Sequence, residues 1–397
     1  MRAILAATCA LLLLAPVGRT EDGEAGALSQ LVRLVAAPGA TCMAVQDEVG
    51  ILVVGQDKQP DRHLSVFFLD AQGEIRDGQP APVLLPKPDS LKDFESYPLG
   101  LALHPTLPVL YVWQDIRGPQ RGTPQEAAVF AEFDHLAVFR AGPGGLELLG
   151  AFGRGEEFAY GQTEGALTVS ADGKRLFVPN LVGPKSAQTP GAIGYYDLDE
   201  AGSLVPVPVP IEGSLDGHGV NKFDMQIRPT WVYTGGWQPL PTGLGFVAPS
   251  RRVVVFCRDY GPCVWDTEDR REALSAVHVR GMGRCRVGGH YAAPAIYGVV
   301  YGGDRLFMME HADGFPTLLP QLLSVPGAQF QSRPVAFKGR YHGVVVGGVN
   351  RVHVVHLDDG GRFTGAWEDV PVPQAAVRAL DYSRKHDRLF VAVDKVP

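Results

Sequence analysis

The sequence predicts an all-β protein, a seven-bladed β-propeller whose last blade is closed by a strand from the N-terminus. Three observations predict this fold. Hydrophobic residues make up 45% of the chain, too large a share for a disordered protein. The 397 residues also include 48 glycines and 32 prolines, so many turns divide the apolar material into short strands. Finally, one unit of sequence recurs about seven times.

Each unit consists of a short apolar strand, a turn, and a strongly apolar strand that ends in Asp or Asn. The units lie at residues 42–57, 100–115, 165–180, 243–259, 298–313, 335–350 and 377–394. A third strand follows several of them, at 63–73, 135–145 and 351–361, and a fourth follows at 146–153. Four strands per unit is the composition of propeller blades, which cover one another's faces around a central axis.

The ends of the chain predict how the propeller closes. The seventh unit stops at Pro397, just after its second strand, whereas residues 30–39 form a strand without an inner partner. We expect residues 30–39 to complete the last blade beside residues 376–394, which leaves that blade one strand short. The propeller is then a single domain over residues 30–397, preceded by a flexible acidic segment at 21–29.

Residues 1–20 have the pattern of a secretory signal peptide. Arg2 precedes an apolar run from Ala3 to Val17, and small residues follow the run. The run is short for a transmembrane span, although an uncleaved N-terminal anchor is the alternative. We therefore expect a secreted or periplasmic protein with no membrane span after removal of the signal. A net charge of -7 argues against nucleic acid as a partner. The expected partner is an unidentified small molecule or protein, and the expected state is a monomer.

Two segments, SADGKRLFVPN at 170–180 and HPTLPVLYV at 104–112, resemble the repeat of the YVTN and lactonase-type seven-bladed propellers. This repeat is shared by enzymes, electron-transfer subunits and binding proteins, so the resemblance implies a fold and not an activity. Our first hypothesis is an exported protein that binds a ligand or a protein partner with one face of the propeller. The alternative is a lactonase-like hydrolase with a site at the axis, and a third hypothesis is a subunit of a periplasmic redox enzyme. No catalytic residue is identified.

The ends of the second strands form the first candidate binding face. In a propeller, the loops after the second strands and the loops between blades emerge on the same face. This phase places together the side chains of Asp57, Asp115, Asn180, Asp259, Asp313, Asn350 and Asp394. One interpretation is that each side chain caps its own turn. The other is an oxygen-rich funnel that holds Ca²⁺, although we expect no cofactor.

A long insertion at residues 211–242 is the second candidate. We expect it to form an inter-blade loop before the fourth unit, and it carries His218, Asn221, Asp224, Arg228, Trp231, Tyr233 and Trp237. Aromatic rings beside polar groups suit a sugar, a cofactor ring or a peptide, and long loops on rigid scaffolds commonly carry function. The alternative is that the tryptophans pack the insertion onto the rim. A neighbouring inter-blade stretch adds Arg286 and His290 to the same face.

The remaining cysteine and histidine patterns are weaker. Cys257 and Cys263 flank a turn and are our preferred disulfide pair, with free buried cysteines as the alternative. His104 lies in a first-hairpin turn, where we expect a turn role and not a catalytic one. His353 and His356 point to opposite faces of one strand, so they cannot share a metal.

Overall fold

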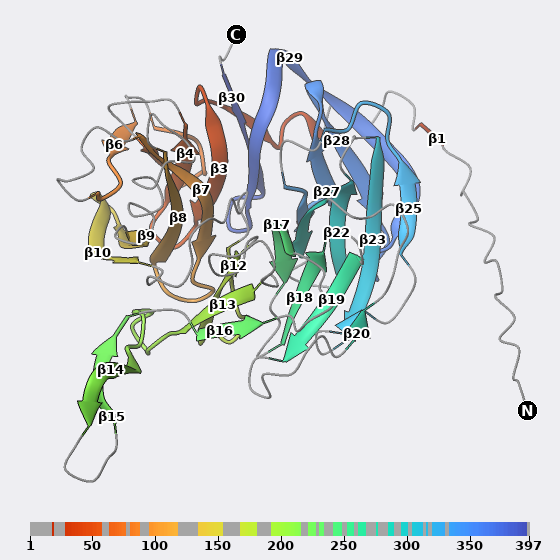
Figure 1. Cartoon of the computed structure of the whole chain (residues 1–397). Coiled ribbons are helices and arrows are strands. Elements are labelled where there is room, and N and C mark those ends of the chain that lie inside the picture. The colour runs from red at the N-terminus through yellow and green to blue at the C-terminus, as the bar shows by residue number, and fades with distance from the viewer. Residues whose placement is uncertain are drawn as a thin grey trace, which may run out of the picture.

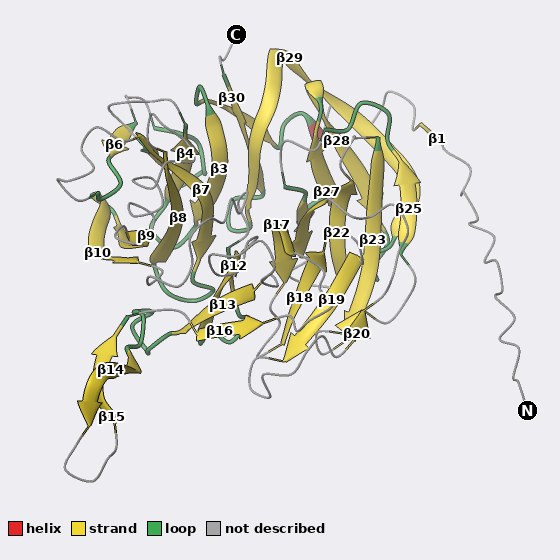
Figure 2. Cartoon of the chain, in the orientation of Figure 1, coloured by secondary structure: helices red, strands yellow, loops and turns green. Residues whose placement is uncertain are grey.

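The computed structural model describes residues 18–19, 28–57, 63–76, 80–87, 95–117, 134–153, 167–180, 192–215, 221–227, 230–233, 241–247, 252–257, 261–266, 275–276, 285–289, 295–300, 304–312, 315–316, 320–329 and 333–394. The elements are β-strands, and their sheets form the blades of a β-propeller (Figure 1, Figure 2). Among the residues just given, no helix is long and apolar enough to cross a membrane.

The first three blades follow one another along the chain, each with its first strand innermost. The first blade contains β3 (Ala40–Gln46), β4 (Ile51–Gln56), β5 (Leu64–Phe68) and β6 (Ala81–Val83). The second contains β7 (Glu95–Leu103), β8 (Val109–Arg117), β9 (Asp134–Gly142) and β10 (Gly145–Gly153). The third contains β11 (Thr168–Val169), β12 (Arg175–Asn180), β13 (Ala192–Asp197) and β16 (Thr230–Tyr233).

The next three blades repeat this arrangement. The fourth contains β17 (Pro241–Val247), β18 (Arg252–Cys257), β19 (Gly261–Asp266) and β20 (Ser275–Ala276). The fifth contains β21 (Cys285–Gly289), β22 (Ala295–Val300), β23 (Arg305–Ala312), β24 (Phe315–Pro316) and β25 (Gln321–Ser324). The sixth contains β26 (Val335–Lys338), β27 (His342–Gly347), β28 (Val349–Leu357) and the first half of β29 (Phe363–Ser383).

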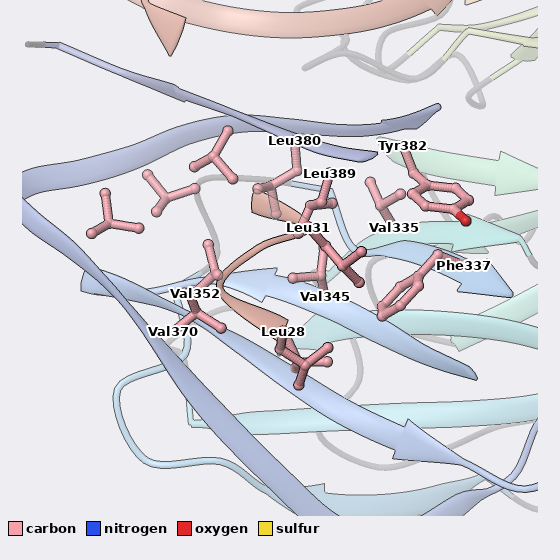
Figure 3. Packing of buried hydrophobic residues seen from close by; sticks show 14 of the residues in the cluster. Leu28, Leu31, Val335, Phe337, Val345, Val352, Val370, Leu380, Tyr382 and Leu389 are labelled. Atoms are coloured by element: carbon pink, nitrogen blue, oxygen red, sulfur yellow. The ribbon is translucent and has the colours of Figure 1, made fainter. Parts of the chain in front are cut away.

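The N-terminal strand closes the seventh blade, as predicted. The second half of β29 is the inner strand of this blade and pairs with β30 (Arg388–Val393). The outer strand is β2 (Val32–Ala36), which runs parallel to β30, with Val35 opposite Ala392. Figure 3 shows Leu28 and Leu31 packed among residues of the sixth and seventh blades. The blade has three strands, so it is one strand short.

Burial explains why these segments become strands. Every residue of β4 and of β22 is buried, because neighbouring blades cover both faces of a second strand. Adjacent blades are also joined by specific hydrogen bonds. The hydroxyl of Tyr111 in the second blade donates to the carbonyl of Gly202 in the third (2.6 Å), and that of Tyr297 in the fifth donates to the carbonyl of Gly361 in the sixth (2.7 Å).

Two expectations about the order of strands are wrong. The fifth unit, 298–313, begins in the second strand of its blade and not in the first, because the inner strand is β21. Its sequence, CRVGG, lacks the apolar character of the other inner strands, and the β22–β23 hairpin mimics their pattern. Asp313 therefore follows a third strand, not a second.

Most of the insertion that the structure describes lies within the third blade and not between blades. Its first part belongs to a hairpin of β14 (Val207–Leu215) and β15 (Asn221–Gln226), which connects the third and fourth strands of the third blade. Figure 1 shows this hairpin projecting from the body of the propeller. The insertion also contains β16, so one part of it projects as a hairpin and another part forms the fourth strand of the third blade.

An ion-pair network supports the closure. Glu74, which follows the first blade's third strand, accepts two hydrogen bonds of 2.5 Å from Arg33 of β2 and one of 3.4 Å from Arg388 of β30. These arginines lower the pKa of Glu74. Because the carboxyl pKa is depressed in the folded state, its stabilisation is present above the ordinary glutamate pKa and is lost as the pH falls below it.

We expect Glu74→Gln to lower the free energy of unfolding at pH 7 by about 1 kcal/mol, since the carboxyl is partly exposed. The difference from the wild type should be smaller near pH 3, because the stabilisation by the carboxylate is lost as the pH falls below the ordinary glutamate pKa. Urea denaturation at the two pH values measures both. Glu147→Gln, which breaks the exposed Arg140–Glu147 pair, is the control and should change nothing. An equal loss at both pH values would contradict the ion-pair explanation.

Candidate functional site

A cavity at the axis of the propeller is the candidate site. Its larger lobe has a volume of about 600 Å³ and its smaller lobe about 230 Å³. The inner strands of six blades line the two lobes: β3, β7, β11, β21, β26 and the second half of β29. We call this space, with both lobes, the axial cavity. The two lobes share the lining residues Thr168, Arg333, Asp381, Tyr382 and Arg384.

The axial cavity opens toward the first hairpins of the blades. Its lining includes Gln46 to Glu48 after β3, His104 and Pro105 after β7, and Arg384 and Lys385 after β29. Each of these segments leads from an inner strand to the second strand of its blade. The predicted ring lies where second strands end, so the axial cavity belongs to the opposite face.

Arg333 is one of the cations that line the axial cavity. It lies directly before β26, is partly buried, and lines both lobes. Its guanidinium makes no hydrogen bond or ion pair with any residue that the structure describes. A partly buried arginine is normally paired with a carboxylate or another anion. The side chain is therefore available to an anionic ligand.

Asp381 faces the same space from β29. Its Oδ2 accepts a hydrogen bond from the backbone N–H of Val45 (2.7 Å), and part of its surface is open to the cavity. Burial raises the pKa of its carboxyl, and the charge of Asp47 adds to this effect. The charge of Arg333 and the backbone hydrogen bonds from Val45 and Tyr382 oppose it. Arg333 is thus close enough to act on Asp381 electrostatically without forming an ion pair with it.

Asp47 fixes the turn that carries the cations at the mouth of the cavity. Its carboxylate accepts hydrogen bonds from the Ser383 hydroxyl and from the backbone N–H groups of Arg384 (2.9 Å) and Lys385 (3.2 Å). The carboxylate belongs to the first blade and the donors to the seventh. The position of Arg384 and Lys385 at the mouth therefore depends on contact between these two blades.

His104 lines the cavity but serves its own turn, as predicted. Its Nδ1 accepts from the N–H groups of Thr106 (3.2 Å) and Leu107 (3.1 Å), which leaves Nε2 to donate to the carbonyl of Gly173 (3.0 Å). Burial lowers the pKa of the ring, so it stays neutral. Nδ1 is used within the turn of the second blade and Nε2 joins that blade to the third, so neither nitrogen is left for catalysis.

The structure brings two members of the predicted ring together. Asp57 and Asp394 meet at Gly39, whose carbonyl accepts from the Asp57 N–H (2.8 Å) and whose N–H donates to Asp394 Oδ1 (3.2 Å). Asp394 also forms an ion pair with Arg378 (2.8 Å), and this pair lowers the pKa of Asp394. Both contacts favour a structural role for Asp394. A third member, Asn350, lies exposed in β28 with φ at 56°, a turn conformation.

The other predicted residues are placed only in part. Asp115 lies in β8 and Asn180 ends β12, while Asn221, Trp231 and Tyr233 lie in β15 and β16, and the side chains of these five are not described. Asp224 is exposed in β15, where Gln226 donates to it. Arg286 is in β21, near enough to affect the Cys42 thiol, as Arg333 does. The residues outside the described part of the chain are Asp259, Asp313, His218, Arg228, Trp237 and His290.

The two cysteines of the predicted disulfide lie on the two strands of one hairpin. The β18–β19 register places Cys257 opposite Gly261 and Cys263 opposite Val255, so the two cysteines are diagonal neighbours. The bridge stays a prediction. Cys42 is a free cysteine, and burial raises its pKa to about 11.

His353 and His356 are separated as expected, since the first bonds Asp369 and the second bonds the adjacent Glu368. In the part of the chain that the structure describes, no three His, Cys, Asp or Glu side chains are grouped as a metal site would require.

Sequence reasoning missed Arg333, Asp381 and Asp47. One signal was available for Asp381, because it is an acidic residue directly between the apolar Leu380 and Tyr382. Arg333 precedes its strand and matches no repeat position.

Comparisons with known proteins show the fold. No family model matches the chain, and no curated protein matches it. Among solved structures, it is similar to the periplasmic gluconolactonase PpgL of Pseudomonas aeruginosa, with 17% identity and a TM-score of 0.53, over 86% of this chain and 88% of that one.

A chain of the mitotic checkpoint complex is similar at 13% identity and a TM-score of 0.53, over 99% and 96% of the two chains. Raptor of Chaetomium thermophilum is similar at 10% identity and a TM-score of 0.54, and this chain, 91% of which is aligned, spans 28% of that protein. These likenesses to lactonase and WD40 structures identify the chain as a β-propeller.

Proposed function

We propose that this protein is an exported binding protein that holds a small organic anion in the axial cavity. One observation carries the proposal: Arg333 presents a partly buried guanidinium to both lobes and forms no hydrogen bond or ion pair with a described residue. The larger lobe is of the size that small-molecule ligands occupy. A carboxylate or sulfonate would accept hydrogen bonds from Arg333, with Arg384 and Lys385 at the entrance.

We expect Arg333→Gln to weaken anion binding about tenfold or more. Loss of a hydrogen bond between charged groups costs about 1.5–3 kcal/mol, and each 1.4 kcal/mol is a factor of ten in affinity. The ligand class is first identified by thermal shift with a panel of small carboxylates and sulfonates, because a ligand bound only by the folded state raises the melting temperature. Isothermal titration calorimetry with the best anion then compares the variants.

Arg305→Gln is the matched control, since Arg305 is exposed in β23 and does not line the cavity. It should bind as the wild type does. Equal affinity of the Arg333→Gln variant and the wild type would exclude Arg333 as the anion-binding group. No shift with any member of the panel would count against the proposal as a whole.

A hydrolase is the second candidate, favoured by Asp381. A cavity carboxyl whose pKa is raised by burial suits general acid–base catalysis, and the neighbouring Arg333 would stabilise negative charge on a substrate oxygen. The likeness to a protein named as a gluconolactonase suggests a lactone as the first substrate to try. Acid release from gluconolactone should then exceed the buffer rate and return to it in Asp381→Asn. A rate equal to buffer for the wild type would exclude this substrate.

A further inference from the structure

We propose that the axial cavity takes up its anion together with a proton, and that Asp381 is the group that receives the proton. The inference rests on the proposed function and concerns its regulation. Arg333 and Asp381 each line both lobes, so a ligand at the junction of the lobes lies against the two side chains at once.

The contacts of Asp381 leave room for a proton. Only one hydrogen bond is fixed on its carboxyl by another strand, from the Val45 N–H to Oδ2. The adjacent hydroxyl of Tyr382 does not compete, because it donates to Asp387 (2.7 Å). A carboxyl that faces a cavity can hold the proton as an O–H donor, and this donor can bond the ligand.

The electrostatic surroundings favour protonation when an anion arrives. The cations that face the cavity around Asp381 are Arg333, Arg384 and Lys385, while the acidic groups are Asp47 and Glu48 and the histidine is His104. Arg333 helps to keep Asp381 ionised, whereas burial and Asp47 favour its protonated form. A bound anion neutralises Arg333 and adds its own repulsion, so both changes shift Asp381 toward the neutral state.

Other groups in the cavity wall are less suited to this role. His104 is held neutral by donors at Nδ1 and by an acceptor at Nε2. Asp47 already accepts three hydrogen bonds from the turn after β29. Glu48 is exposed at the mouth, where water screens its charge. Among the described residues, Asp381 is the carboxyl that lines both lobes together with Arg333.

The thermodynamic linkage between proton uptake and anion binding gives the sign and size of the pH effect on affinity. If binding takes up one proton, the dissociation constant falls tenfold for each unit that the pH is lowered, between the pKa values of the bound and free states. The probe is methanesulfonate, whose charge does not change between pH 4 and pH 8. We expect its affinity for the wild type to rise about tenfold or more between pH 7 and pH 5.

The test is titration calorimetry of methanesulfonate into the full chain from pH 5 to pH 8. Asp381→Asn mimics the protonated carboxyl, so it should bind more tightly than the wild type at pH 7, with affinity independent of pH. Glu48→Gln is the matched control and should keep the pH dependence of the wild type. Titration of the wild type in two buffers with different heats of ionisation measures proton uptake directly and needs no folded variant.

The outcomes separate this inference from the proposed function. No binding of methanesulfonate by the wild type at any pH would overturn both. Binding with an affinity that does not vary with pH, or without proton uptake, would overturn the coupling and leave anion binding supported. Coupling that persists unchanged in Asp381→Asn would exclude Asp381 as the proton acceptor.

Discussion

Replacing Val35 with aspartate is expected to lower the free energy of unfolding by about 4 kcal/mol or more. Val35 is 1% exposed and lies in β2, the strand that closes the seventh blade. It belongs to a hydrophobic cluster that includes Phe390 of β30 and Met43 of the first blade. An aspartate at this position would place a carboxylate between two blades, where apolar side chains offer it no hydrogen bond. The closure of the ring would then be disrupted at the three-stranded seventh blade.

Urea denaturation followed by tryptophan fluorescence measures this effect. Val349→Asp is the matched control, because Val349 is 51% exposed in β28 and the same substitution there adds a solvated charge. We expect the control to change the free energy of unfolding by about 0.5 kcal/mol or less. If the two variants unfolded at the same urea concentration, β2 would not be part of the folded sheet.

The closure was predictable because it follows from counting strands. Residues 30–39 have an apolar pattern but no neighbouring strand with which to pair, and the last unit lacks its outer strands. A β-strand cannot leave its backbone groups unpaired in a buried position, so the two incomplete parts complete each other. What sequence did not reveal is that β29, with 21 residues, passes without a break from the sixth blade into the seventh.

The fifth blade shows why strand phase is harder to predict. Every inner strand lies near the axis, where glycine and polar residues are acceptable, so it carries a weaker apolar signal than the second strand. Gly288 of β21 has so little space that a Cβ there would lie 2.3 Å from the carbonyl oxygen of Pro334. The need for glycine at this close approach removes the strand's apolar signature.

The cavity was not predictable, because it is made by convergence. Asp381 accepts a hydrogen bond from Val45, which lies 336 positions away along the chain. Arg333 reaches the same space from the start of the sixth blade. Repeat phase identifies residues that occupy equivalent positions in successive blades. A binding site at the axis instead depends on residues that differ from the repeat pattern. A single sequence does not show which of these differences contribute to binding.

Removing the carboxylate of Asp47 is expected to have the second large effect. Asp47→Ala should lower the free energy of unfolding by about 2–3 kcal/mol, because hydrogen bonds to a charged group contribute about 1.5–3 kcal/mol when buried and less when exposed. The three bonds that are lost join the first blade to Ser383, Arg384 and Lys385 of the seventh. They therefore act across the closure, beside the mouth of the axial cavity.

Limited proteolysis of the turn after β29 measures how firmly Asp47 holds that turn. Trypsin cleaves after arginine and lysine, so limited proteolysis should cut the turn at Arg384 and Lys385 faster in Asp47→Ala than in the wild type. Asp199→Ala is the matched control, since Asp199 caps a turn within the third blade through the N–H groups of Ala201 (2.9 Å) and Ser203 (2.8 Å). It should cost about 1 kcal/mol and leave cleavage at the turn unchanged. Equal cleavage in the wild type and Asp47→Ala would mean that the turn is held by its own backbone, and that Asp47 does not position the cations at the entrance.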